Sequence, residues 1–157
     1  VTLQYGGEYF AAAVGEVNVV EKMKEVDAVI GGEGNGGVIY PELHYGRDAL
    51  VGVGLFLTYL CEQKCTCSEL KENLPIYYMS KNKIELEPTT DVDAILNKIA
   101  DKYKNERVTT IDGVKIDFED GWVHLRKSNT EPIIRIYSEG KTEEEAERFA
   151  KLIIDSI

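Results

Sequence analysis

The chain has 157 residues, of which 43% are apolar, and 28 acidic against 18 basic side chains give a net charge of −10. This length suits one ordinary domain or two small ones, and the apolar content argues against global disorder. The negative charge disfavours a nucleic-acid partner, because such a surface needs concentrated basic side chains. No apolar run is long enough to cross a membrane, since the longest, 49–61, is interrupted by Gly52 and Gly54.

The first part of the chain, residues 1–62, has the pattern of a mixed α/β domain. Apolar residues at helical spacing predict a helix over 17–26, and residues 27–30 predict a short buried strand. Residues 31–37 contain five glycines. They predict a turn, because glycine allows positive φ and close backbone approach. A brief strand is predicted at 38–40.

A second helix is predicted over residues 49–61, with Asp48 as its N-cap. It is apolar nearly all round, so we expect it to be buried against a sheet. Residues 63–82 are expected to form a connector. The connector contains a short helix over 68–74, with Ser68 as its cap and a proline as its stop.

The remainder, residues 83–157, has the pattern of a compact α+β domain. Asp-Gly pairs at 112–113 and 120–121 predict hairpin turns between alternating strands. We expect an antiparallel sheet covered by two helices on one face. The strand-like segments are 76–79, 84–86, 108–111, 114–118, 122–125 and 133–137. The helices are expected over 92–103, capped by Thr90, and from Thr142 onwards, with Glu145 completing a capping box.

Residues 126–132, with Arg135, form a candidate phosphate site. Strand-like alternation on both sides predicts a hairpin, so Arg126 and Arg135 should stand on neighbouring strands at the mouth of its loop. Bidentate guanidinium groups and short side-chain donors are the groups that hold phosphate. The donors here are those of Ser128, Asn129 and Thr130. A polar hairpin tip with two solvated arginines would show the same spacing.

The glycine-rich turn is a second candidate, because it contains one carboxylate, Glu33, and one amide, Asn35. A carboxylate held on such a turn can accept hydrogen bonds from vicinal sugar hydroxyls. A surface turn with a solvated glutamate fits the composition too. The spacing matches neither a Walker loop nor a dinucleotide-binding motif.

Three cysteines, Cys61, Cys65 and Cys67, lie close together. An odd number in a tight cluster fits free thiols in a reducing cytosol better than a disulfide framework. A metal site would need more ligands nearby, and the sequence has only two histidines. We therefore expect no metal site in this chain.

Both candidate sites resemble those of the α-D-phosphohexomutases, the family of phosphoglucomutase, phosphomannomutase and phosphoglucosamine mutase. Arg-x-Ser-Asn-Thr-Glu-Pro, followed by Ile-Ile-Arg-Ile, is similar to the phosphate-binding loop of the family's last domain. Gly-Gly-Glu-x-Asn-Gly is similar to the sugar-binding loop of its third domain. Asn35 and Gly37 depart from the commonest form of that loop and, with residues 45–48, look more like the phosphoglucosamine and archaeal-type branch.

The resemblance implies a role for each candidate residue. Glu33 and Asn35 would bind sugar hydroxyls. The residues that would hold the non-reacting phosphate are Arg126, Ser128, Asn129, Thr130 and Arg135.

The resemblance covers only the C-terminal part of such an enzyme. The family's phosphoserine motif and its Asp-Gly-Asp-x-Asp metal loop are absent from this sequence. The full-length protein, with upstream domains, would interconvert hexose 1-phosphate and hexose 6-phosphate through a phosphoserine. It would use Mg²⁺ and would be cytoplasmic, whereas this fragment, with no catalytic residue, would be inactive.

Two rival hypotheses differ in class from this one. The first is a stand-alone, non-catalytic module that binds sugar phosphates. The second is a nucleic-acid binder that uses the antiparallel sheet. We disfavour the second because of the acidic charge and the lack of a basic, aromatic sheet face.

Overall fold

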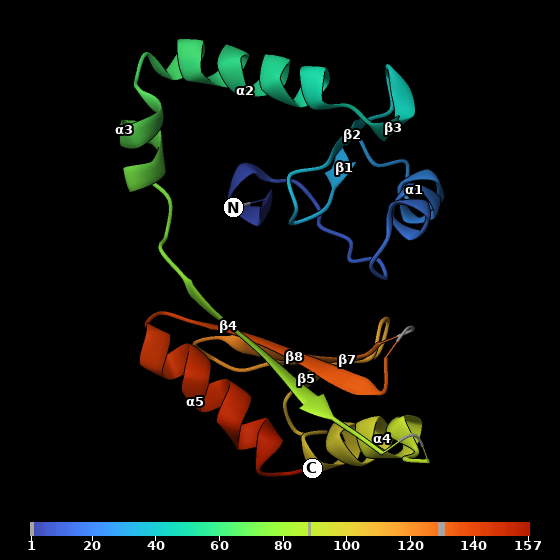
Figure 1. Cartoon of the computed structure of the whole chain (residues 1–157). Coiled ribbons are helices and arrows are strands. Elements are labelled where there is room, and N and C mark those ends of the chain that lie inside the picture. Colours follow the sequence, from blue (N-terminus) through green and yellow to red (C-terminus); the bar gives the residue numbers. More distant parts are fainter. Residues whose placement is uncertain (1, 88, 129–130) are drawn as a thin grey trace. The chain divides into compact units, whose positions relative to one another are not determined.

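The computed structural model describes residues 2–87, 89–128 and 131–157. It divides the chain into two compact units, Val1–Leu74 and Pro75–Ile157, and each unit is described by itself. The boundary falls inside residues 63–82, where the sequence predicts a connector. Figure 1 shows the elements of both units in chain order.

The first unit combines helices with a small antiparallel sheet of three strands in the order β1-β2-β3. β1 and β2 flank the glycine-rich turn, and β2 and β3 form the next hairpin. The elements are a 3-10 helix at Thr2–Tyr5, α1 (Glu16–Glu25), β1 (Gly31–Gly32), β2 (Val38–Tyr40), β3 (His44–Arg47), α2 (Ala49–Gln63) and α3 (Cys67–Glu72).

The strand predicted at residues 27–30 is wrong, because the end of α1 uses these residues. Asp27 has a φ of 52°, and the Ala28 N–H donates to the Met23 carbonyl at 2.9 Å. This left-handed turn is a common way to end a helix. The strand begins only afterwards, at Gly31, and Val29 is 79% exposed.

Helix α2 starts where the sequence predicts, since the Asp48 carboxylate accepts from the Val51 N–H at 2.9 Å. Its expected burial is wrong. The helix meets β2 near Gly52, yet none of its residues is buried and Leu50 is 84% exposed. None of the helices in the described ranges has the length and apolarity needed to cross a membrane.

Helix α3 begins one residue earlier than predicted and has a different cap. Thr66, not Ser68, caps it, in a complete capping box with Glu69. All three cysteines of this region are free thiols.

The second unit is a five-stranded antiparallel sheet in the order β4-β8-β7-β6-β5. The predicted hairpins at both Asp-Gly pairs are confirmed by the pairing of β5 with β6 and of β6 with β7. The elements are β4 (Tyr78–Glu85), α4 (Val92–Lys102), β5 (Arg107–Thr109), β6 (Val114–Asp117), β7 (Trp122–Lys127), β8 (Ile133–Gly140) and α5 (Glu143–Ile154).

Three local predictions in this unit need correction. The two short strands predicted before α4 are one continuous strand, β4. Helix α4 is capped by Asp91, whose carboxylate accepts from the Ala94 N–H, and not by Thr90. Thr142 caps α5 as predicted, but the Glu145 carboxylate accepts from the Lys141 N–H instead of completing a capping box.

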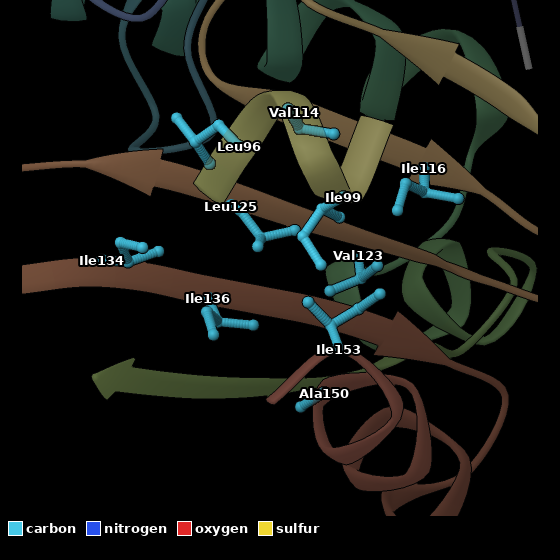
Figure 2. Close-up of a cluster of buried hydrophobic side chains, with 10 residues drawn as sticks. All are labelled: Leu96, Ile99, Val114, Ile116, Val123, Leu125, Ile134, Ile136, Ala150 and Ile153. Atoms are coloured by element: carbon cyan, nitrogen blue, oxygen red, sulfur yellow. The ribbon is translucent and has the colours of Figure 1, made fainter. Parts of the chain in front are cut away.

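One apolar cluster joins both helices of this unit to one face of its sheet, as Figure 2 shows. Alternation along each strand places every second residue in this cluster. The two helices on one face of an antiparallel sheet confirm the predicted α+β fold. The buried members are Leu96, Ile99, Val114, Ile116, Val123, Leu125, Ile134, Ile136, Ala150 and Ile153.

Candidate functional site

The predicted phosphate loop connects β7 to β8. Arg126 and Arg135 are direct cross-strand partners at its mouth, as the sequence predicts. The Ser128 N–H donates to the Ile133 carbonyl at 3.1 Å and closes the base of the loop. Asn129 and Thr130, which the sequence analysis assigned to the same site, lie outside the described residues.

Each of the two arginines has an acidic partner at a long distance. Arg126 lies 3.4 Å from Asp112, and Arg135 lies 3.8 Å from Glu131. Both distances exceed the 2.7–2.9 Å or so of a strong charge-assisted hydrogen bond. Like charges directly opposite on neighbouring strands repel each other. The pair therefore favours an anion that satisfies both guanidinium groups together.

A third cation, Lys83, extends this pair across the sheet. Lys83 on β4 is the cross-strand partner of Arg135 on β8. The side chains of Arg126, Arg135 and Lys83 are 27%, 39% and 63% exposed. Arg126 is thus the most shielded from water, and its charge should act on an anion most strongly. Lys83 could not be predicted as part of this site, because nothing near it in sequence indicates that β4 pairs with β8.

The face of this sheet opposite the apolar cluster is basic and aromatic, so the expectation that the sheet lacks such a face is wrong. Lys81 Nζ lies 5.7 Å from the Tyr137 ring centroid, and Lys115 Nζ lies 5.2 Å from that of Trp122. Acidic residues on the same strands offset part of the charge, as in the ion pair of Lys115 with Asp117. That no nucleic acid binds stays a prediction.

Glu33 and Asn35 lie together on the glycine-rich turn between β1 and β2. The turn is closed by the Glu33 N–H, which donates to the Gly37 carbonyl at 3.1 Å. The Asn35 side-chain oxygen accepts from the Gly37 N–H at 2.9 Å. Gly32 is required here, because a Cβ on it would lie 2.3 Å from the Gly37 carbonyl oxygen. Tight backbone packing thus holds both candidate side chains in place.

The Glu33 carboxylate already has one partner, the Gly15 N–H at 3.2 Å. A carboxylate can accept several hydrogen bonds, so this bond orients Glu33 and leaves capacity for hydroxyl donors. Glu33 and Asn35 both line a cleft of about 530 Å³ in the first unit. Asn35 also lines a neighbouring cleft of about 600 Å³, beside Arg47. These volumes are in the range of small-molecule sites.

Glu16 and Arg47 form a support beside this turn that the sequence analysis missed. The Glu16 carboxylate accepts from the Arg47 side chain at 2.9 Å and from its backbone N–H at 3.2 Å. The Arg47 stem lies where Gly37 would have a Cβ, at 2.7 Å. The ion pair spans 31 residues of sequence, and no local pattern could have revealed it.

The stability of the first unit should depend on pH through Glu16. The backbone N–H and the guanidinium of Arg47 lower the pKa of Glu16 below its ordinary value of 4.5. The unfolded chain therefore binds this proton more readily, so the stabilisation is present above pH 4.5 and is lost as pH falls further. We expect Glu16→Gln to show a smaller fall in Tm between pH 5 and 3 than the unmodified chain.

Thermal unfolding followed by circular dichroism measures this difference. Glu21→Gln is the matched control, because Glu21 lies on the same helix and forms no ion pair within the described part of the chain. If both variants showed the same pH dependence, Glu16 would not be the titrating group.

No metal centre is evident in the described ranges. They contain no group of three or more His, Cys, Asp or Glu side chains arranged to hold a metal ion. The Mg²⁺ that the family resemblance implies therefore finds no ligand set among these residues.

Comparisons with known proteins agree for both units. Residues 1–78 match the alpha/beta/alpha domain III of phosphoglucomutase/phosphomannomutase, and residues 80–156 match the C-terminal domain. A phosphoglucomutase/phosphomannomutase of Thermococcus kodakarensis is 40% identical over 94% of this chain and 32% of that protein. A phosphoglucosamine/phosphogalactosamine mutase of Sulfurisphaera tokodaii is 42% identical over 83% of this chain and 29% of that protein.

The fold agrees as well. A crystal structure of a phosphoglucomutase/phosphomannomutase family protein from Burkholderia thailandensis aligns with a TM-score of 0.74. The alignment covers 98% of this chain and 34% of that one at 23% identity, so it concerns the fold alone. The chain spans about a third of the length of the curated relatives it matches. On the two matched domains, the chain belongs to the phosphoglucomutase/phosphomannomutase family.

Proposed function

We propose that the chain is the sugar- and phosphate-holding part of a phosphohexomutase. The full-length protein would interconvert hexose 1-phosphate and hexose 6-phosphate of glucose, mannose or glucosamine, through a phosphoserine. The observation that carries the proposal is the cross-strand pair of Arg126 and Arg135 at the mouth of the phosphate loop. The pair lies in the region that matches the family's C-terminal domain.

The β7–β8 hairpin would hold the phosphate that does not react. Arg126 can present two N–H donors to two phosphate oxygens, and Arg135 and Ser128 can take others. The Arg-x-Ser-Asn-Thr-Glu-Pro motif adds Asn129 and Thr130 to this set. In a mutase the same pocket must hold the non-reacting phosphate in both substrate orientations, and an anion site on one short hairpin suits this because its contacts do not depend on the rest of the sugar.

The glycine-rich turn would bind sugar hydroxyls. Glu33 supplies a carboxylate acceptor and Asn35 an amide that can both donate and accept. The two sites thus bind the sugar and one phosphate, and phosphoryl transfer would use a phosphoserine and Mg²⁺ outside the described residues of this chain. The proposal also places the full-length enzyme in the cytoplasm.

The chain alone is expected to show no mutase activity, because phosphoryl transfer needs a donor and a metal as well as positioning. The test is a coupled assay with glucose, mannose and glucosamine phosphates, a hexose bisphosphate activator and Mg²⁺. The full-length protein in the same assay is the control and should turn over at least one of them. A full-length protein that binds these sugars without turnover would favour the stand-alone binding module instead.

In the full-length enzyme, Glu33→Ala is expected to lower kcat/KM about 10- to 150-fold, because a hydrogen bond to a charged group is lost. This factor corresponds to a loss of about 1.5–3 kcal/mol of transition-state stabilisation. Steady-state kinetics on each hexose phosphate measure this change. Glu42→Ala is the matched control, since Glu42 lies in the same unit, between β2 and β3, and lines neither cleft. Unchanged kinetics of Glu33→Ala on every hexose phosphate would reduce Glu33 to a turn residue.

A further inference from the structure

The turn before β6 contacts the phosphate hairpin from an adjoining part of the sheet. Asp112 lies in this turn, 14 residues before Arg126, and its carboxylate lies 3.4 Å from the Arg126 guanidinium. Both side chains are about one quarter exposed, at 28% and 27%. A carboxylate in this position is unexpected beside an anion site, because its charge repels the anion.

The backbone holds this turn tightly against β7. Gly113 has a φ of 69°, and a Cβ on it would lie 2.1 Å from the Leu125 carbonyl oxygen and 3.1 Å from the Arg126 Cα. The Asp112 carbonyl oxygen lies 2.5 Å from His124 Nε2, which donates to it. Contacts with β7, the strand that contains Arg126, thus set the position of Asp112.

A second carboxylate, that of Asp93, pairs with the cation next to Arg126, which could otherwise compete for Asp112. Lys127, next to Arg126 on β7, pairs with Asp93 of α4 at 3.1 Å. These four side chains line one cleft of about 290 Å³. With Lys127 held by Asp93, the Asp112 carboxylate is paired with Arg126, and each cation has its own acidic partner.

We propose that Asp112 is a positioning residue for Arg126. Its carboxylate contacts one side of the guanidinium at 3.4 Å and favours one rotamer, so the other N–H donors are oriented before phosphate arrives. A long side chain that is already ordered loses less conformational freedom on binding. This inference rests on the proposed function, because it assigns Asp112 to the same phosphate site.

Positioning and simple electrostatics predict opposite results for Asp112→Asn. Removing a negative charge next to an anion site should tighten phosphate binding if the charge alone matters. If Asp112 orders Arg126, the same variant should weaken binding by about three- to tenfold, in the lower part of the range of coupling between contacting residues. Asparagine keeps the turn, since it favours the same backbone conformations as aspartate.

The test is a titration of the 157-residue chain with inorganic phosphate, followed by NMR. Asp120→Asn is the matched control, because Asp120 also lies in an Asp-Gly turn of this sheet and pairs with a cation, Lys141. We expect weaker binding for Asp112→Asn, unchanged binding for Asp120→Asn, and recovery in Asp112→Glu, which restores the carboxylate. Equal or tighter binding by Asp112→Asn overturns the proposal.

Two further measurements separate this role from general support of the fold. In an Arg126→Lys background, Asp112→Asn should have no additional effect on affinity, because the guanidinium it orients is absent. An equal loss in both backgrounds overturns the proposal. Without phosphate, the side-chain Nε–H signal of Arg126 should be sharp in the unmodified chain and broadened in Asp112→Asn. A chain whose Arg126 signal behaves this way but binds no phosphate contradicts the proposed function, whereas an unchanged signal contradicts only the positioning role.

Discussion

Arg126→Ala is expected to lower the affinity of the chain for inorganic phosphate by about 2–3 kcal/mol, or about 30- to 150-fold. The variant would lose the proposed charged, bidentate contact at Arg126, which is less exposed than Arg135 and Lys83. Affinity of the unmodified chain should be only about millimolar, because a small ligand on an open site gains few contacts. NMR titration should therefore show binding for the unmodified chain and none for the variant.

Arg107→Ala is the matched control for this prediction. Arg107 lies on the same sheet, in β5, and has a longer ion pair, with Asp117 at 3.8 Å, but it is 84% exposed and lies two strands away from β7. Arg126→Lys should bind more weakly than the unmodified chain although it keeps the charge, because lysine lacks the planar fork. Equal effects of Arg107→Ala and Arg126→Ala would show that phosphate responds only to overall charge.

The binding should also depend on the solution in a defined way. Added salt should weaken it, because the contact is largely ionic. With a hexose phosphate as the ligand, a fall in pH through about 6 should weaken binding as well, since the monoester dianion then takes up a proton. Binding that is insensitive to both would contradict an anion site at this hairpin.

Ile136→Ala is expected to destabilise the second unit by about 2–5 kcal/mol, because it leaves a cavity in a packed core. Ile136 is fully buried among the side chains of Figure 2. Urea unfolding followed by tryptophan fluorescence measures this change for the second unit, since Trp122 is the single tryptophan of the chain. Ile76→Ala, at a site 70% exposed, should stay within about 0.5 kcal/mol. Equal losses in both variants would mean that the cluster is not the stabilising core.

The second unit was largely predictable because its signals are local. Asp-Gly turns fix where a hairpin reverses, and alternation then fixes which residues face the core. The same two rules place Arg126 opposite Arg135, which is the central feature of the candidate phosphate site. The glycine-rich turn of the first unit was recognisable for a similar reason, since its geometry depends on backbone contacts within seven residues.

Most of the errors came where a pattern depends on distant partners, and one came from a local turn. The periodicity of α2 shows that the helix is apolar on most sides, but it does not show which element covers those sides. The strand predicted at 27–30 is wrong because the apolar residues indicated a strand where a left-handed turn at Asp27 ends α1. Lys83 and the pair of Glu16 with Arg47 were missed because each depends on contacts across tens of residues.

The order of strands has a consequence for how the second unit assembles. β4 is the first strand of this unit along the chain, yet it pairs with β8, the last, so that Tyr78 lies opposite Gly140. Closing so long a loop slows folding, because chain entropy is lost before the contacts form. Lys83 joins the arginines only when this pairing is complete, so the full row of cations exists only in the finished sheet. A phosphate ion that binds these three cations would stabilise the completed sheet relative to its partly formed precursors.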